Sequence, residues 1–285
     1  MKSIFQALVV ISFLGTQANA QNAEPDTSWK TGGFIGLNFT QVSLSQWAPG
    51  GENSMSFAGV VNLFSNYEKG KVQWMNNFDM NYSMLKSGDI GLRKNDDRLE
   101  LNSKYSRKIS EHWLYSGLFN FKSQLANGYN YPNDSLVISK FMAPGFLTLS
   151  IGFTYKPVDY FEVMISPVAS KMTFVNDQFL SDAGAYGVDP GKKVRSEFGA
   201  YLNMRFKKDI MENVTLASKL ELFNNYTDKD KDNAKKIDVN WESTLTLKVN
   251  KFLTASVVAQ VVYDANIVER TQFREVLGIG FGYKF

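Results

Sequence analysis

The last ten residues, Val276-Leu-Gly-Ile-Gly-Phe-Gly-Tyr-Lys-Phe285 (VLGIGFGYKF), decide the fold. Apolar side chains occupy every second position, and glycine or lysine stands between them. Successive side chains of a β-strand point to opposite faces, so this stretch predicts a strand with one apolar face. A soluble protein rarely ends on such a strand, because termini fray and exposed apolar edges aggregate. We interpret the stretch as the closing strand of a β-barrel in a membrane, with Gly278, Gly280 and Gly282 facing its lumen.

The same two-residue period runs through most of the chain. Between Val72 and Met84, for example, mostly apolar side chains alternate with mostly polar ones. Most such segments reach the roughly 9–11 residues that a tilted strand needs to cross a bilayer. The twelve segments lie near 34–46, 53–66, 71–85, 97–109, 113–126, 145–156, 160–173, 194–207, 213–226, 237–249, 252–264 and 272–285. The pattern predicts an all-β chain that forms a single transmembrane antiparallel up-and-down β-barrel of about twelve strands.

Short and long connections alternate between these segments. The turns EKGK, SEHW, KPVDY, KKDIMEN and NKF are short, whereas most other connections are longer polar loops such as GYNYPNDSLVISKFMAPG. Outer-membrane barrels have short periplasmic turns and long outer loops, which places both ends of this barrel on the periplasmic side. The last strand must then pair with the first near Ile35, Leu37 and Phe39, because an unpaired edge in lipid leaves backbone groups without partners.

The alternative is a soluble β-sandwich or lipocalin-like barrel, whose apolar faces would point inward. Three features favour the membrane. Aromatic residues stand near strand ends, as in interfacial girdles, and charges lie mid-strand on the polar faces. Tyr283 and Phe285 also resemble the carboxy-terminal signal that the barrel-assembly machinery reads. That machinery and outer-membrane lipid are therefore the expected partners.

The first twenty residues, MKSIFQALVVISFLGTQANA, have the features of a secretory signal peptide. Lys2 gives a positive start, a short apolar core follows, and Ala18-Asn19-Ala20 forms a small-x-small cleavage site. We expect cleavage before Gln21 and export to the cell outer membrane, with 21–31 a short periplasmic tail and 32–285 the barrel. No other stretch approaches the roughly 18 continuous apolar residues of a transmembrane helix.

The composition excludes several kinds of site. The chain has no cysteine and one histidine, His112, which removes disulfides, thiolate chemistry and multi-histidine zinc sites. A formal net charge of +3 gives no basis for a nucleic-acid partner. His112 stands beside Ser110 and Glu111 in a predicted periplasmic turn, and residues adjacent in sequence do not generally form a catalytic relay. We therefore predict no catalytic residue, no metal site and no cofactor, and disfavour an outer-membrane hydrolase.

One loop carries a family resemblance. Gln46-Trp47, Gly50-Gly51-Glu52-Asn53-Ser54 and the later stretch DVNWESTLTLKVNKFLTA, with Tyr263-Asp264 after it, resemble a family of Bacteroidota outer-membrane barrels known only as a domain of unknown function. The resemblance implies an outer-membrane location and brings no catalytic residues. Trp47, Gly50 and Gly51 fit a girdle tryptophan beside a tight turn, and the alternative is an exposed docking loop.

Charged residues of both signs share the predicted lumenal face. Strand parity assigns eight acids and eight bases to this face: Asp79, Glu100, Glu162, Glu197, Glu221, Asp238, Glu242, Asp264, Arg98, Lys104, Lys108, Lys122, Arg205, Lys219, Lys248 and Arg274. One interpretation is cross-strand pairing that fills a narrow lumen. The other is a permeation path with opposite charges on facing walls, since a ring of one sign is absent.

The loop that begins at Asp228 is the last candidate site. Its alternating acids suggest calcium, but an EF-hand needs glycine at its sixth position and glutamate at its twelfth, where this loop has Asn233 and Val239. A solvated loop fits better. The sequence thus predicts a pore or transporter for small polar solutes, and the alternative is a non-conducting scaffold in an envelope complex.

Overall fold

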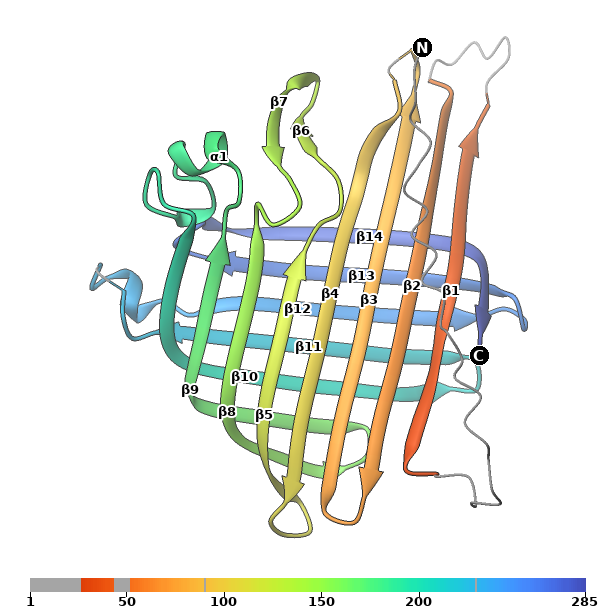
Figure 1. Cartoon of the computed structure of the whole chain (residues 1–285). Helices are drawn as coiled ribbons and strands as arrows, with labels where there is room; N and C mark the ends of the chain where they lie inside the picture. The colour runs from red at the N-terminus through yellow and green to blue at the C-terminus, as the bar shows by residue number, and fades with distance from the viewer. Residues whose placement is uncertain (1–26, 44–51, 90, 229) are drawn as a thin grey trace, which may run out of the picture.

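Twelve strands form one closed antiparallel barrel (Figure 1). The computed structural model describes residues 27–43, 52–89, 91–228 and 230–285. The barrel strands are β1 (Trp29–Val42), β2 (Ser54–Lys69), β3 (Val72–Ser87), β4 (Arg93–Lys108), β5 (Trp113–Ser123), β8 (Gly145–Val158), β9 (Phe161–Phe174), β10 (Val194–Met211), β11 (Val214–Asn225), β12 (Asp238–Lys248), β13 (Leu253–Asp264) and β14 (Val268–Lys284). The all-β fold and the twelve-stranded barrel are confirmed.

The strand bounds differ from the sequence pattern at the two ends of the sheet. β1 begins at Trp29, inside the segment predicted as a tail, and β14 begins at Val268 rather than at 272. The connection between β13 and β14 is therefore three residues long, the shortest of those predicted to face outward. The predicted signal peptide lies outside the described residues.

The outer surface of the barrel is apolar. The rows on β1 and β14 are the most exposed, and Leu37, Leu277 and Phe281 each have about 70% of their surface accessible (70%, 71% and 69%). The lumen is polar, with Ser116 0% and Thr154 1% exposed. Apolar outside and polar inside is the reverse of a soluble barrel.

Aromatic rings gather at the ends of strands that short turns join. Trp29 lies with its ring centroid 5.2 Å from that of Tyr67 and 6.0 Å from that of Trp74. Further around the barrel, the rings of Trp113 and Tyr155 are 4.9 Å apart. All three tryptophans are more than 40% exposed, so the turn end of the barrel presents an aromatic belt.

The closing strand pairs with β1 as the sequence predicts. Residues Gly280–Lys284 pair with Phe34–Asn38, so that Leu37 lies opposite Phe281. Beyond this register, Gly33 and Phe285 exchange two backbone hydrogen bonds of 3.0 and 3.1 Å. Both apolar rows face outward. The last pair is Asn38 with Gly280, so the seam ends before Phe39, which the sequence predicted to be part of it.

A proline interrupts β9 and changes which of its residues face the lumen. Pro167 lies where the register shifts on both sides of the strand, against β8 and against β10. Proline has no N–H for a ladder and is found at such bulges. Gly152 fits opposite, since a Cβ there would lie 2.1 Å from the carbonyl oxygen of Ile165. Before the bulge the buried residues are Met164 and Ser166, and after it they are Ala169 and Thr173.

Two loops stand at the end of the barrel opposite the short turns (Figure 1). One carries the hairpin of β6 (Gly128–Asn130) and β7 (Asn133–Ser139), and the other carries α1 (Gln178–Asp182) and the 3-10 turn η1 (Ala185–Gly187). The sequence pattern does not predict these elements. The hydroxyl of Tyr186 donates to the carbonyl of Ile138 at 2.7 Å, which joins the two loops. Within the described ranges, every helix is too short or too polar to span a membrane.

Candidate functional site in the barrel lumen

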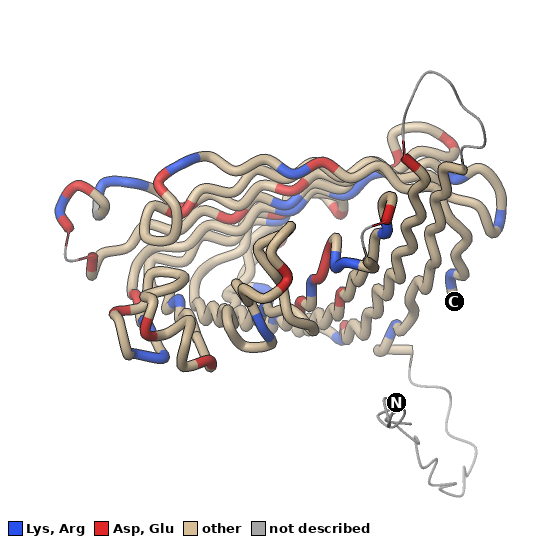
Figure 2. The backbone as a smooth tube through the Cα atoms, turned by 90° about the horizontal axis from the view of Figure 1, so that it is seen from above, with Lys and Arg blue, Asp and Glu red and all other residues tan. Residues whose placement is uncertain are grey.

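Charged residues are unevenly distributed around the barrel. The wall formed by β1–β3 is almost free of them, whereas the far wall carries Lys, Arg, Asp and Glu along its strands (Figure 2). This asymmetry places the polar chemistry of the lumen between β4 and β5 on one side and β9–β13 on the other.

Glu100 on β4 is the centre of the lumenal network. Its side chain is almost fully buried, and Lys219 of β11 donates to one of its oxygens at 2.6 Å. Asn120 donates to the same oxygen at 2.7 Å, while Arg98 binds the other at 2.5 Å. Arg98 also pairs with Glu242 of β12. These bonds join strands on opposite sides of the barrel, so the lumen is crossed by side chains.

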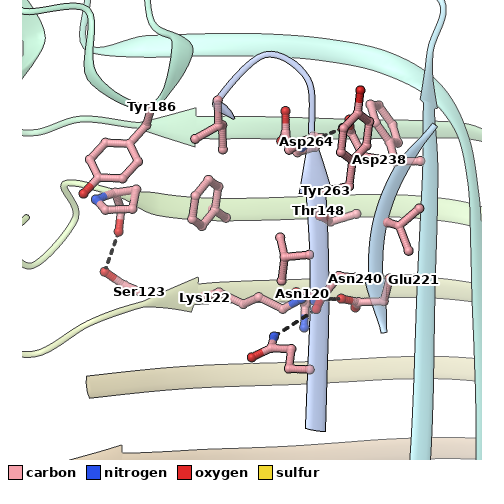
Figure 3. Close-up of a pocket in the computed structure, with 18 of the residues that line it drawn as sticks. Asn120, Lys122, Ser123, Thr148, Tyr186, Glu221, Asp238, Asn240, Tyr263 and Asp264 are labelled. Atoms are coloured by element: carbon pink, nitrogen blue, oxygen red, sulfur yellow. Dashed lines mark hydrogen bonds and ion pairs between the residues drawn. The ribbon is translucent and has the colours of Figure 1, made fainter. Parts of the chain in front are cut away.

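Glu221 on β11 is a second buried acid at the same level. It pairs with Lys122 of β5 and with Lys219, whose Nζ lies 3.0 Å away. The hydroxyl of Tyr201 and the amide of Asn240 donate to it at 2.9 and 2.8 Å. Figure 3 shows Lys122 and Glu221 reaching toward each other from their two strands. Glu100 and Glu221 thus share Lys219, and each carboxylate has several donors.

A further cluster lies toward the loops. Lys171 of β9 binds Asp238 of β12 at 2.7 Å and Asp264 of β13 at 2.6 Å. Arg195 lies 3.2 Å from Glu197 and 3.9 Å from Asp264. Three acids share two cations here, which holds β9, β10, β12 and β13 together near the mouth.

Toward the short turns the lumen contains buried polar side chains that contact one another. Lys104 of β4 pairs with Glu162 of β9 at 2.5 Å. Three hydroxyls continue the network, with Ser116 2.8 Å from both Ser106 and Thr154. At this level the lumen is filled by side chains that bind one another.

The remaining predicted residues lie at the edges of this network. Arg205 donates to Asn102 of β4 at 2.6 Å. Arg274 of β14 binds Asp96 of β4, and Asp79 accepts from Asn62 at 2.6 Å. Lys108 and Lys248 are the last residues of β4 and β12, at the turn end and away from the central carboxylates.

A cavity of about 470 Å³ lies on the loop side of the central carboxylates. Its charged lining residues, such as Lys122, Glu221 and Asp264, already pair with protein groups. The rest of the lining is largely aromatic and aliphatic, and includes Phe146, Phe223, Tyr186, Val262 and Ile267. Figure 3 shows Tyr186 and Ser123 at one side of this space and Asp238 and Asp264 at another. Its volume lies in the range of small-molecule sites.

The loops above the cavity are tied to the barrel wall. Gln124 donates to the carbonyl of Lys140 at 3.1 Å and accepts from Lys94 and Ser139, each at 3.0 Å. Asp177 caps α1 by accepting from the N–H of Leu180 at 3.0 Å. Burial raises the pKa of Tyr186, which keeps its hydroxyl a neutral donor. The roof of the cavity is therefore fastened at several points.

The structure adds residues that the parity argument omitted. Lys171 was missed because the Pro167 bulge switches the inward positions of β9 from even to odd numbers. Asp96 lies one residue before the segment predicted for β4, and Arg195 shares the parity of Glu197, which was a usable signal. The uncharged partners Asn120 and Tyr201 carry no charge pattern that marks them. The predicted loop motif Trp47, Gly50 and Gly51 lies outside the described residues.

The other residues that the sequence singled out lie in a turn or on the outer face of the barrel. His112 lies in the turn between β4 and β5 with its ring 6.4 Å from that of Tyr155. Tyr283 and Phe285 stack on the outer face with centroids 6.1 Å apart. Across the described residues, no group of three or more histidine, aspartate or glutamate side chains is placed to hold a metal ion.

Residues 39–129 match the sequence profile of a family described as "Protein of unknown function (DUF3078)". The match includes the Trp47 loop, not the late stretch after Asp238, and carries no information on the source organism. A comparison with curated proteins finds no significant match.

Solved structures with a similar fold include several outer-membrane proteins. The COG4313 outer membrane channel from Pseudomonas putida F1 is 15% identical with a TM-score of 0.43, and covers 92% of this chain and 100% of its own. The NanC porin is 10% identical with a TM-score of 0.41, over 89% and 100% of the two chains. The channel DcaP of Acinetobacter baumannii is 9% identical with a TM-score of 0.36, over 90% and 97%. The function proposed below therefore rests on the geometry of this chain.

Proposed function

We propose that the chain is an integral outer-membrane barrel that acts as a closed, gated pore or transporter for small polar solutes. The observation that carries the proposal is the cavity of about 470 Å³ on the loop side of the carboxylate network. The cavity offers a binding space, and the ion pairs beneath it close the way to the turn side. A solute that passes must displace or rearrange those pairs.

The membrane location is supported by the outside of the barrel. Its exposed rows are apolar, its lumen is polar, and aromatic rings gather at the turn end. In hydrocarbon every backbone polar group needs an internal partner, and a closed barrel supplies one wherever neighbouring strands are paired. We also propose the usual orientation, with short turns in the periplasm.

Orientation is tested by tags on intact cells. A tag in the 176–193 loop should be labelled by a reagent that does not cross the membrane, and a tag in the KPVDY turn should not. Labelling at KPVDY alone would reverse the orientation. Labelling at both positions would mean that the outer membrane is not intact.

Pore function is tested by single-channel conductance of the purified protein in planar bilayers. Wild type should be mostly closed with rare openings, because the lumen is crossed by ion pairs. Arg98→Gln removes the ion pair that joins β4 to Glu242 of β12. Both side chains of this pair are partly accessible. The variant should be open at least tenfold more often. Lys69→Gln, at the turn end of β2, is the matched control and should behave as wild type.

The cross-lumen ion pairs also support the second candidate, a non-conducting scaffold in an envelope complex. A barrel filled by paired side chains needs no solute. The same recordings separate the two candidates. If neither wild type nor Arg98→Gln conducts while both insert normally, the scaffold is favoured and the pore proposal fails.

A further inference from the structure

The seam between β1 and β14 is paired over only part of the length of the two strands. It contains five residue pairs, from Phe34 opposite Lys284 to Asn38 opposite Gly280. Every other interface between neighbouring barrel strands contains between ten and sixteen such pairs. Residues 268–279 of β14 have no partner in the described part of β1. The unpaired part lies on the loop side.

The backbone groups left over on β14 follow from the hydrogen-bond pattern. Gly33 and Phe285 exchange both of their bonds, whereas the N–H of Gly282 bonds to Phe252 on the other side. Partners alternate along an antiparallel strand, so odd-numbered residues of β14 direct their backbone groups toward β1. At Leu277 and Ile279, which an extended seam register would place opposite Gln41 and Phe39 of β1, those groups have no strand partner among the described residues.

The side chains beside this edge are amphipathic. Phe273, Leu277 and Ile279 are 67%, 71% and 58% exposed on the outer face. Glu275 lies among them with the same parity and is also exposed, whereas the outward rows of the other strands are mostly apolar. Arg274 points the other way and binds Asp96 of β4. A carboxylate beside apolar side chains suits contact with lipid headgroups and water better than contact with hydrocarbon alone.

We infer that the loop-side part of the β1–β14 seam is a lateral opening between the lumen and the outer leaflet, which admits an amphipathic molecule from the membrane. The inference rests on the membrane location proposed above. Unpaired backbone groups in hydrocarbon are costly, so the edge needs water or the polar part of an amphiphile. The outward Phe273, Leu277 and Ile279 contact its apolar part.

A short route joins this opening to the lumenal cavity. Arg274 bonds to Asp96 and, at 3.5 Å, to Gln260. Gln260 and the neighbour of Asp96, Asp97, both line the cavity. The Arg274–Asp96 pair therefore stands between the seam and the cavity. The aromatic and aliphatic part of the cavity wall suits the apolar part of such a molecule, and the polar part of the wall suits its polar end as well as the small polar solutes proposed above.

The opening is tested with a fluorescent reporter, because the chain has no cysteine to interfere. Bimane is attached to Thr40→Cys, which has the inward parity of Asn38 and lies beyond the last seam pair. The protein is placed in phosphatidylcholine vesicles with a nitroxide on the acyl chain. Controls are Val257→Cys, predicted to face lipid, and Thr148→Cys in the cavity wall.

The proposal expects Thr40→Cys to be quenched at least threefold more than Thr148→Cys. Quenching of Thr40→Cys as weak as that of Thr148→Cys, with Val257→Cys strongly quenched, would overturn the opening and leave the membrane location intact. Weak quenching of Val257→Cys would instead overturn the membrane location.

A second measurement uses disulfide formation in the membrane. Extension of the seam register would place Thr40 opposite Gly278. The pair Thr40→Cys/Gly278→Cys should oxidise at least fivefold more slowly than Thr244→Cys/Val258→Cys, which are direct partners in the zipped β12–β13 interface. Equal rates would mean that the seam is closed in the membrane and would overturn the proposal.

Discussion

The barrel is closed in two different ways at two places. At the seam, β14 meets β1 through a short ladder of backbone hydrogen bonds, with glycines such as Gly280 against Asn38. Across the lumen, β4 meets β11 and β12 through charged side chains, with buried Glu100 bound to Lys219 and half-buried Arg98 bound to Glu242. The seam depends on the alternation of apolar and small residues and on the position of the last residue of the chain. The contacts across the lumen depend on particular charged side chains.

The barrel wall is held by backbone hydrogen bonds between strands, whereas the lumen is filled by paired side chains. A backbone ladder tolerates many side chains, provided that apolar and small residues alternate. A buried ion pair tolerates few changes, because removal of one partner leaves an uncompensated charge. Variants at the two places should therefore fail in different ways.

The largest effect is expected at the chain end. Phe285→Asp removes the terminal apolar side chain while its backbone pair with Gly33 could still form. If the barrel-assembly machinery reads this residue, heat-modifiable folded barrel in the outer membrane should fall about tenfold, while removal of the predicted signal peptide should stay normal. Phe285→Leu is the control and should retain most of it. Normal folded levels of Phe285→Asp would show that the phenylalanine is not read as an assembly signal.

The central carboxylate should give the next largest effect. Glu100→Gln leaves Lys219, Arg98 and Lys122 near a neutral group, and should lower the free energy of unfolding by about 3–5 kcal/mol. Denaturant unfolding in detergent measures it. Glu68→Gln, an exposed residue at the turn end of β2, should cost under about 0.5 kcal/mol. In Glu100→Gln/Lys219→Met part of the loss should return, and strict additivity would argue against a coupled network.

A charge placed on the outer face of the barrel should lower stability by an amount that depends on its depth in the membrane. Val257 pairs with Leu245 and Leu277, in rows predicted to face lipid. Val257→Arg should cost about 2–4 kcal/mol if the site is near the midplane. Ser256→Arg, on the neighbouring inward position, should cost much less in the same unfolding assay. Similar costs at both positions would refute the parity assignment and the distinction between wall and lumen.

The smallest effect is expected in the loops above the cavity. The hydrogen bond from Lys140 and the N–H of Leu180 hold the pKa of Asp177 below its ordinary value. A lowered pKa means that the stabilisation is present above the unfolded value near 4 and is lost as pH falls through the folded value. Hydrogen exchange of 178–182 should therefore rise below about pH 4. Asp177→Ala should show raised exchange at all pH values, a loss of about 1 kcal/mol, and Asp134→Ala should not.

The sequence predicts the strands of the barrel better than the side-chain contacts in its lumen, for a physical reason. Two-residue alternation determines which face of a strand is apolar, so the twelve strands and the shared outward direction of Leu37 and Phe281 follow from it, whereas the register that pairs these two residues does not. Pairing across a lumen depends on which strands lie opposite each other in the closed barrel, and no local sequence pattern determines that. The partners of Glu100 therefore needed the structure, and so did Lys171, whose direction the Pro167 bulge reverses.

The long-range ion pairs also bear on the order in which the barrel forms. Arg98 and Glu242 are 144 residues apart, and Lys219 and Glu100 are 119 apart. If strands assemble from one end as hairpins, the partners that bind Glu100 are limited to Arg98, Asn120 and Lys122 until β11 arrives. Loop closure over such separations is slow. The lumen should therefore remain hydrated through most of assembly and dry out in its final steps, after the wall has formed.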